Sequence, residues 1–143
     1  MSVARVAFVI LACMILFAGC SGKPLANPAT SVTFNGQTTY QPGAPVIGDL
    51  ITLSFTLIDN TTDGTAITAM PYQVSLDGAV IATGSTAAIA ANSTTVTTSV
   101  IQISTAGEHT VVITLDPGQT TGFVDASANA QTLLITVGPA ASG

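Results

Sequence analysis

LITLSFTLID, residues 50–59, is the stretch that decides the fold of this chain. Its apolar residues fall at every second position, and most of the positions between them carry hydroxyl groups. A period of two places the apolar side chains on one face of a β-strand and the hydroxyls on the other. The stretch therefore predicts a half-buried strand from Leu50 to Asp59.

The same alternation continues along the chain on both sides of this segment. A second alternating segment begins near Met70 and ends at Leu76, and Asp77-Gly78 follows as a type I′ hairpin turn into the next strand. Further strands are predicted at Ser31–Phe34, Thr94–Ile103, Glu108–Leu115 and Gln131–Val137. No segment carries a capped 3.6-residue apolar repeat. The sequence predicts an all-β chain, an immunoglobulin-like antiparallel β-sandwich of about seven strands over residues 31–138, with a tail at 139–143.

Charged side chains are scarce and strongly biased toward acid. The 143 residues include 2 Lys+Arg and 7 Asp+Glu, and both bases, Arg5 and Lys23, lie near the N-terminus. Binding of nucleic acid depends on Lys and Arg that neutralise phosphates, so nucleic acid is excluded as a partner. An anionic membrane would likewise repel the body of the chain, and membrane attachment requires another device.

The N-terminus has the form of a hydrophobic signal segment. Arg5 precedes an apolar run from Val6 to Ala18, which is shorter than the roughly 20 residues a membrane-spanning helix needs. The run ends in Phe17-Ala18-Gly19-Cys20. These four residues resemble the lipobox of bacterial lipoproteins, with Phe17 at the position where that family usually has Leu. The alternatives are an ordinary signal peptide with an incidental Cys20, and an uncleaved anchor.

The lipobox resemblance implies a signal peptide at residues 1–19 and a covalent diacylglycerol and acyl lipid, such as palmitate, on Cys20. Residues 20–30 then form a flexible tether, because the stretch mixes Pro with small and polar residues. The chain would be exported and held on the cell membrane by its lipid, and on the outer membrane if the source has two membranes. No other cofactor is expected.

A second resemblance is carried by Leu76-Asp77-Gly78 and by Ala106-Gly107 with Val111 at the start of the penultimate strand. Over Val46–Val137 these features resemble CARDB, the cell-adhesion-related domain found in bacteria. The resemblance implies an extracellular immunoglobulin-like sandwich that serves adhesion or ligand binding without catalysis.

His109 is the one histidine of the chain and lies in phase with the apolar residues of its predicted strand. Immunoglobulin-like domains often place a tyrosine here that ties a corner of the sandwich. We expect His109 to play that structural part, because no nucleophile lies near it in sequence and no Lys or Arg accompanies it. The chain is therefore not expected to be an enzyme.

Four acids are weak candidates for calcium ligands, and we expect them to be ordinary loop residues. The stretch from Asp59 to Gly64 begins like a calcium loop, but Met70 stands where such a loop needs a bidentate Glu. An ion could also be shared across the long loop before the last strand. The four candidates are Asp59, Asp63, Asp116 and Asp125.

Two aromatic residues are candidate ligand contacts. Phe123 lies among Thr, Gly and Asp in a loop longer than hairpins need, and Tyr40 precedes the turn Pro42-Gly43. Each packs back on the sandwich or contacts a partner. We expect a lipid-anchored envelope module that recognises an extracellular or envelope protein or glycan through its loops. The alternative is a structural accessory subunit of an envelope assembly that docks by an edge strand.

Overall fold

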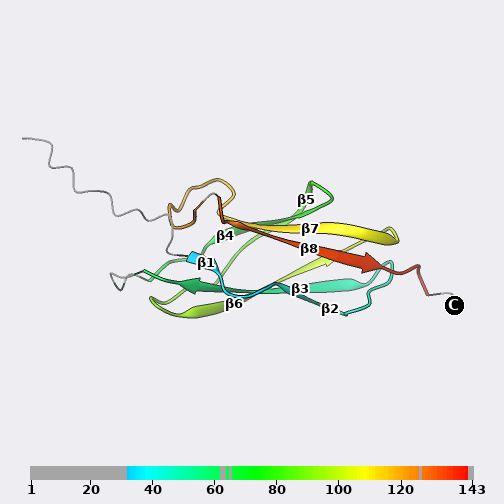
Figure 1. The fold of residues 1–143 in the computed structure, drawn as a ribbon, viewed down its shortest axis with the longest axis horizontal. Helices are drawn as coiled ribbons and strands as arrows, with labels where there is room; N and C mark the ends of the chain where they lie inside the picture. The colour runs from blue at the N-terminus through cyan, green and yellow to red at the C-terminus, as the bar shows by residue number, and fades with distance from the viewer. Residues whose placement is uncertain (1–31, 62–63, 65, 126, 142–143) are drawn as a thin grey trace, which may run out of the picture.

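The structure, a computed structural model, describes residues 32–61, 64, 66–125 and 127–141. These residues form two four-stranded sheets packed face to face, and none of them is in a helix (Figure 1). Every pairing between strands is antiparallel, so the all-β sandwich expected from the sequence is confirmed. The strands are β1 (Val32–Phe34), β2 (Thr39–Gln41), β3 (Leu50–Asp59), β4 (Pro71–Leu76), β5 (Ala79–Ser85), β6 (Thr94–Gln102), β7 (Gly107–Leu115) and β8 (Ala130–Val137).

The first sheet is built around β3. β6 pairs with β3 along nearly its whole length, and the short strands β1 and β2 pair with successive parts of its other edge. The second sheet has the order β5-β4-β7-β8. The structure contains one strand beyond the expected seven or so, the three-residue β2, which is too short to show an alternating pattern.

The core lies between the sheets and is made by the alternation that the sequence displays. Along β3 the odd-numbered residues from Ile51 to Asp59 are buried, and the hydroxyl-bearing positions between them are half-exposed. Phe55 lies at the centre, with its ring edge-on to Tyr72 at 5.3 Å and to Phe34 at 6.1 Å between centroids. Such edge-to-face contacts add to the stabilisation from burial.

The hairpin between β4 and β5 has the predicted type I′ turn. Asp77 and Gly78 both have positive φ, 49° and 87°, which this turn requires at its two central positions. Asp tolerates this backbone conformation better than most residues, and Gly adopts it freely. The turn fixes the position of the Asp77 side chain, which the next subsection uses.

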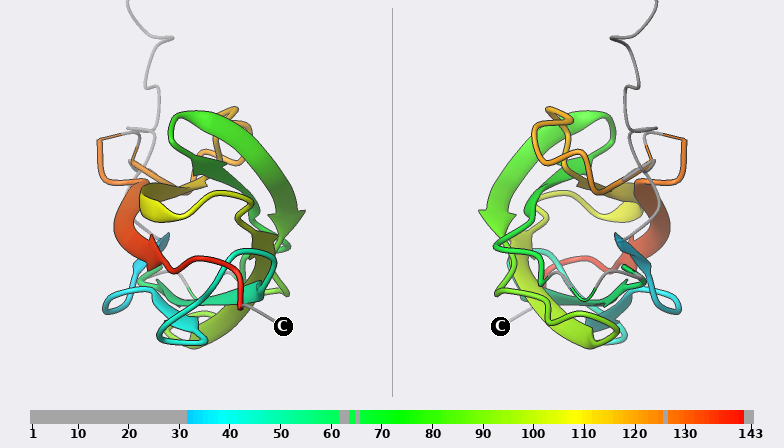
Figure 2. Two further views of the ribbon diagram at one scale, coloured as in Figure 1. Left: turned by 90° about the vertical axis from the view of Figure 1, so that its right-hand side faces the viewer. Right: turned by 90° about the vertical axis from the view of Figure 1, so that its left-hand side faces the viewer.

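The two sides of the sandwich differ. On one side β8 lies above β1 and β2, and on the other side β5 reaches down beside β6 (Figure 2). Val32, where the described chain begins, lies at one end of the sandwich, where its N–H donates to the carbonyl of Phe123 at 3.1 Å. The last described residues leave from the opposite end (Figure 1).

Candidate functional site

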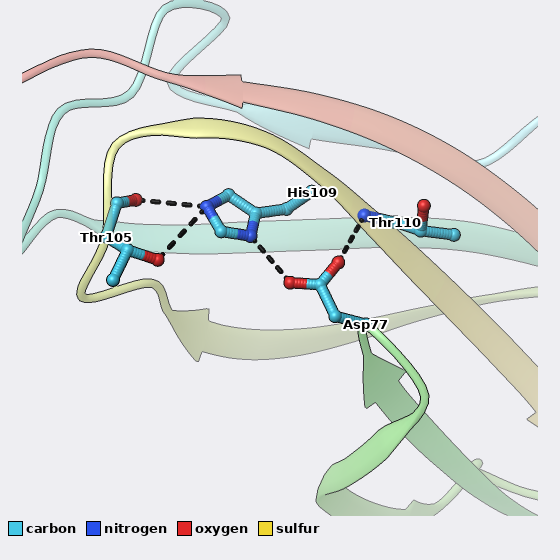
Figure 3. Close-up of polar contacts among 4 residues, drawn as sticks. All are labelled: Asp77, Thr105, His109 and Thr110. Carbon is cyan, nitrogen blue, oxygen red and sulfur yellow. Dashed lines mark hydrogen bonds and ion pairs between the residues drawn. The ribbon is translucent and has the colours of Figure 1, made fainter.

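The only histidine is held between a turn and a loop by both ring nitrogens (Figure 3). Nδ1 of His109 lies 2.7 Å from Oδ2 of Asp77, and Nε2 lies 3.0 Å from the carbonyl oxygen of Thr105. The second carboxylate oxygen of Asp77 accepts from the backbone N–H of Thr110 at 2.8 Å. His109 is 8 % exposed, in phase with the other buried residues of β7, so the inward position expected for it is confirmed.

This arrangement favours the doubly protonated imidazole. The hydrogen bond with Asp77 raises the pKa of His109, burial opposes the change, and the Thr105 carbonyl adds to the rise. The hydrogen bond from His109 also lowers the pKa of Asp77, aided by the Thr110 amide. Each ring nitrogen therefore faces an acceptor, and both nitrogens donate when the ring is charged.

Asp77, His109 and Thr105 have the order of groups seen in a hydrolytic triad, but their geometry suits a structural link. We call this link the His109 tie. The Thr105 hydroxyl lies 3.3 Å from Nε2, farther away than the carbonyl of the same residue. A general base must offer a lone pair to the hydroxyl, whereas the carbonyl requires a hydrogen on that nitrogen. The three residues join the β4–β5 turn to the start of β7.

A groove opens on the side of the sandwich between β2 and β8. It encloses about 440 Å³ and is lined by Gln37, Thr38, Tyr40, Gln131, Thr132, Leu133 and Leu134. No lining residue is charged, and the lining combines amides, hydroxyls, one aromatic ring and two leucines. Amides and hydroxyls around an aromatic ring suit a neutral ligand, either a peptide or a sugar.

Hydrogen bonds cross this side of the sandwich in the groove at Gln131 and farther along the edge of β8 at Gly138. In the groove, Oε1 of Gln131 accepts from the N–H and the hydroxyl of Thr38 at 3.0 and 2.6 Å. Nε2 of Gln131 donates to the carbonyl of Gly36 at 2.7 Å. Beyond the groove, past the end of β8, the N–H of Gly138 donates to the carbonyl of Pro45 at 2.8 Å. Residues of β2 and β8 line the groove itself.

Both aromatic candidates are half-buried against the hydrophobic core. Tyr40 lines the groove, so its ring is available to a ligand there, and no hydrogen bond of its hydroxyl occurs within the described residues. Phe123 packs near the start of β1, where its carbonyl accepts from Val32, and does not line the groove. The structure therefore separates the two residues.

The described acids among the calcium candidates act as hydrogen-bond acceptors for their own loops. Asp116 accepts from the N–H and hydroxyl groups of Thr120 and Thr121. Burial would raise the pKa of Asp116, but these hydrogen bonds outweigh it and the pKa is lowered. Asp125 accepts from Ser127, which lowers its pKa as well.

Asp59 is fully buried, and its two carboxylate oxygens differ. Oδ1 accepts from the N–H of Thr61 at 2.8 Å, and Oδ2 has no hydrogen-bond partner within the part of the chain that the structure describes. Asp63 lies outside the described residues. Among the residues that the structure describes, no three His, Cys, Asp or Glu side chains are grouped to hold a metal ion.

The lipobox residues Phe17, Ala18, Gly19 and Cys20 lie outside the described residues. No helix within the described part of the chain is long and apolar enough to cross a membrane. The position of the lipid anchor therefore stays a prediction.

Gln131 and Thr38, which line the groove, had no signal in the sequence, and Asp77 had a signal only for its turn. Gln131 and Thr38 are separated by 93 residues, and a lone Gln at the start of a strand gives no hint of its partner. Asp77 was identified for its turn, but its ion pair with His109 joins residues 32 positions apart. The Asp77-Gly78 turn signal could have indicated a side chain fixed in place, and only the β4–β7 register reveals its partner.

No protein-family model and no curated protein matches the chain. Solved structures do match its fold. The crystal structure of a CARDB domain from Pyrococcus furiosus, in complex with di-metal ions, has a TM-score of 0.62 and 14 % identity over 76 % of this chain and 93 % of that one. A domain from Methanosarcina acetivorans, named as part of a cell-surface protein, has a TM-score of 0.57 and 17 % identity over 76 % of this chain and 92 % of its own.

A third match is to part of a larger enzyme. The β-glucosidase of Listeria innocua has a TM-score of 0.51 and 14 % identity, with 75 % of this chain matched to 16 % of that one. At these identities the matches show the fold. The described residues form an immunoglobulin-like β-sandwich with the fold of the CARDB domains.

Proposed function

We propose that this chain is a lipid-anchored protein of the cell envelope whose sandwich binds a neutral protein or glycan partner and catalyses no reaction. The observation that carries the proposal is the uncharged groove between β2 and β8, on a fold shared with cell-adhesion-related domains. A partner that docks there meets amides, hydroxyls and the Tyr40 ring. The sequence pointed to the loops as the binding region, and we propose instead the groove on the β2–β8 side of the sandwich.

The charge of the described residues supports a neutral partner. Lys and Arg are absent from them, so anionic ligands have no counter-charge. Asp116 accepts from Thr120 in its own loop, and Asp77 accepts from the N–H of Thr110 on β7, so hydrogen bonds within the domain already occupy these carboxylates. Recognition then depends on shape and on hydrogen bonds in the groove.

The lipid anchor is tested with the two cysteines of the chain as a matched pair. Cells that express the full chain are grown with labelled palmitate, and we expect the label in the wild type and in Cys13→Ser but not in Cys20→Ser. Label retained by Cys20→Ser would overturn the anchor. A protease too large to cross the envelope, added to intact cells, then tells whether the sandwich is exposed: rapid loss supports adhesion, and protection directs the search to partners inside the envelope.

The groove is tested by adhesion of cells that display the full chain. We expect Tyr40→Ala to reduce adhesion several-fold, because the ring lines the groove. Val96→Ala is the matched control, since Val96 is exposed on β6, at the other edge of the first sheet. Surface amounts of all variants are equalised first. Equal adhesion of the Tyr40→Ala and Val96→Ala variants would move the binding site away from the groove.

A further inference from the structure

The edge of β8 carries a row of backbone groups that have no hydrogen-bond partner among the described residues. The carbonyl of Asn129 accepts from the N–H of Leu115 on the β7 side, at 2.8 Å. Gly138 uses both its N–H and its carbonyl on the opposite side, toward Pro45 and Ile47. Successive residues of a strand direct these groups to opposite edges. The even-numbered residues between them therefore face away from β7: Ala130, Thr132, Leu134 and Thr136.

No backbone hydrogen bond on that edge occurs within the described residues between Ala130 and Thr136. The pairing of β8 with β7 has no bulge, so the edge is regular over this length. Edge strands are commonly protected by Lys, Pro or a bulge, and β8 has none of these. The segment around Val46 already pairs with Gly138 in parallel, which shows that this edge accepts another strand.

The geometry points to a second copy of this chain as the occupant of the edge, paired antiparallel through residues 130–136 of both copies around a two-fold axis at Leu133. This inference rests on the proposed function, because it names the partner of the same groove. In this register Ala130 lies opposite Thr136 of the second copy, and Thr132 lies opposite Leu134. Each of these pairs exchanges two backbone hydrogen bonds.

The register is set by the length of the free edge. At one end Gly138 is occupied by the Pro45–Ile47 segment, so a partner strand must end opposite Thr136. At the other end β8 begins at Ala130. The free stretch is symmetric about Leu133, and an antiparallel copy of itself therefore fills it without meeting the segment around Val46.

The side chains suit this pairing. Leu133 is half-buried toward the groove beside Tyr40, and its copy would approach it across the axis and cover the apolar part of the groove. Leu134, 59 % exposed on the outer face, would pack beside Thr132 of the second copy. Two acidic domains repel each other where charges meet, and β8 and β2 carry no charge. This side is thus a surface through which copies can approach.

The direction of β8 gives the pair a function in adhesion. β8 runs from the end where the described chain begins toward the end where it leaves (Figure 1). Antiparallel pairing places the first described residues of the two copies at opposite ends of the pair. With a lipid anchor ahead of each sandwich, the pair would join two facing membranes.

Disulfide cross-linking tests the pairing on the full chain purified in detergent. Thr132→Cys and Leu134→Cys chains, with tags of different size, are oxidised alone and as a mixture. Paired residues would have Cα atoms about 5.5 Å apart, within disulfide range, while copies of the same residue would lie beyond it. We expect about tenfold more mixed dimer than same-variant dimer.

Val100→Cys is the control for collision, because Val100 is 54 % exposed on the other sheet. The wild type measures any background from Cys13 and Cys20. Mixed dimer no more abundant than the Val100→Cys dimer would overturn the pairing and leave the groove to a foreign strand or a glycan. Equal yields from the mixture and the single variants would overturn the register.

Leu134→Lys and Leu134→Pro test the edge without a new cysteine. The N–H of residue 134 faces away from β7, so proline removes a bond to the second copy and none to β7. We expect both variants to keep the circular dichroism of the wild type and to sediment with half its mass. A wild type that sediments as a monomer would overturn the inference.

Vesicles separate this inference from the proposed function. Vesicles that carry the lipidated full chain should cluster, and those with Leu134→Lys should not. Cross-linking without clustering would support the pairing and overturn the opposed anchors. No cross-linking, with palmitate label and Tyr40-dependent adhesion intact, would overturn the pairing and leave the proposed function standing.

Discussion

The two sides of the sandwich are closed by different chemistry. On the β5–β6 side the ring of Tyr72 packs edge-on to Phe55, and its hydroxyl donates to the carbonyl of Thr98 on β6 at 3.4 Å. On the β2–β8 side no aromatic pair among the described residues bridges the sheets. Hydrogen bonds cross this side at Gln131 in the groove and at Gly138 farther along the edge of β8. We call the β5–β6 side, which is filled by apolar side chains, the packed side. We call the β2–β8 side, which is held by hydrogen bonds, the clasped side.

The difference between the two sides indicates where this domain can bind a partner without loss of stability. Apolar packing is part of the core, so a change on the β5–β6 side should cost global stability. Hydrogen bonds near solvent contribute less, because water replaces them when they break. The β2–β8 side can therefore open toward a partner at low cost, and substitutions on the two sides should separate stability from binding.

Tyr72→Ala should give the largest loss. The side chain is 8 % exposed, and its removal leaves a cavity beside Phe55. Truncation of a buried aromatic residue costs about 3–5 kcal/mol of the free energy of unfolding. Urea unfolding followed by circular dichroism measures the loss. Tyr40→Ala, on the clasped side, should cost clearly less, and a cost equal to that of Tyr72→Ala would erase the distinction between the sides.

Gly84→Ala should be the next most damaging change. A Cβ at Gly84 would lie 2.5 Å from Oη and 2.6 Å from Cζ of Tyr72, so the ring would have to move from its place against Phe55. Overpacking of this kind costs about 1–3 kcal/mol. Gly43→Ala is the matched control, because a Cβ there meets no atom within 4 Å. The same urea titration should show no loss for the control.

Gln131→Ala should cost about 1 kcal/mol, the usual net contribution of hydrogen bonds, since it removes part-buried bonds to Thr38 and an exposed bond to Gly36. Its main effect should be local. Hydrogen exchange of the Thr38 amide, which donates to Gln131, should rise while amides near Tyr72 keep their protection. Thr132→Ala, a neighbour with an exposed side chain, is the control. Faster hydrogen exchange both at Thr38 and near Tyr72 would show that the hydrogen bonds of Gln131 stabilise the whole core.

Local patterns in the sequence predicted the elements but not the contacts between distant ones. The alternation of residues 50–59 and the Asp77-Gly78 turn depend on neighbours in the chain, so β3 and the first hairpin were predictable. β6 is different, because threonine occurs on both of its faces. Thr97 and Ser99 point inward while Val96 and Val100 are exposed, which hydrophobicity alone would reverse.

The candidate site was less predictable than the fold for the same reason. The burial of His109 followed from its phase in β7, and its partner depended on the register between β4 and β7. The groove required knowing that β2 exists and that β8 is an edge strand. Neither fact leaves a mark within a few residues of Tyr40 or Gln131. Local alternation in a sequence therefore indicates which residues are buried, but it does not indicate which of these residues contact one another.

The smallest effect should come from His109→Gln, and it should depend on pH. The pKa of His109 is raised above 6.5 by Asp77, so the tie contributes fully below the unfolded pKa and is lost as the pH rises through the folded value. The pKa of Asp77 is lowered from 3.8, so its share is present above that pH and lost in stronger acid. The difference in Tm between wild type and variant should be largest between these limits.

The measurement is Tm at about pH 5 and about pH 9, where the wild type should lose its advantage over His109→Gln as the pH rises. Asp125→Asn is the control, because the lowered pKa of Asp125 gives a contribution that changes only in acid. The His109 tie joins the β4–β5 turn to the start of β7, at the opposite end of β4 from Tyr72 and on the other sheet from Tyr40. Its loss should therefore speed hydrogen exchange equally at Tyr72 and at Tyr40. Faster hydrogen exchange at only one of the two residues would mean that the His109 tie stabilises that side alone. The difference between the packed and clasped sides would then include the contribution of His109.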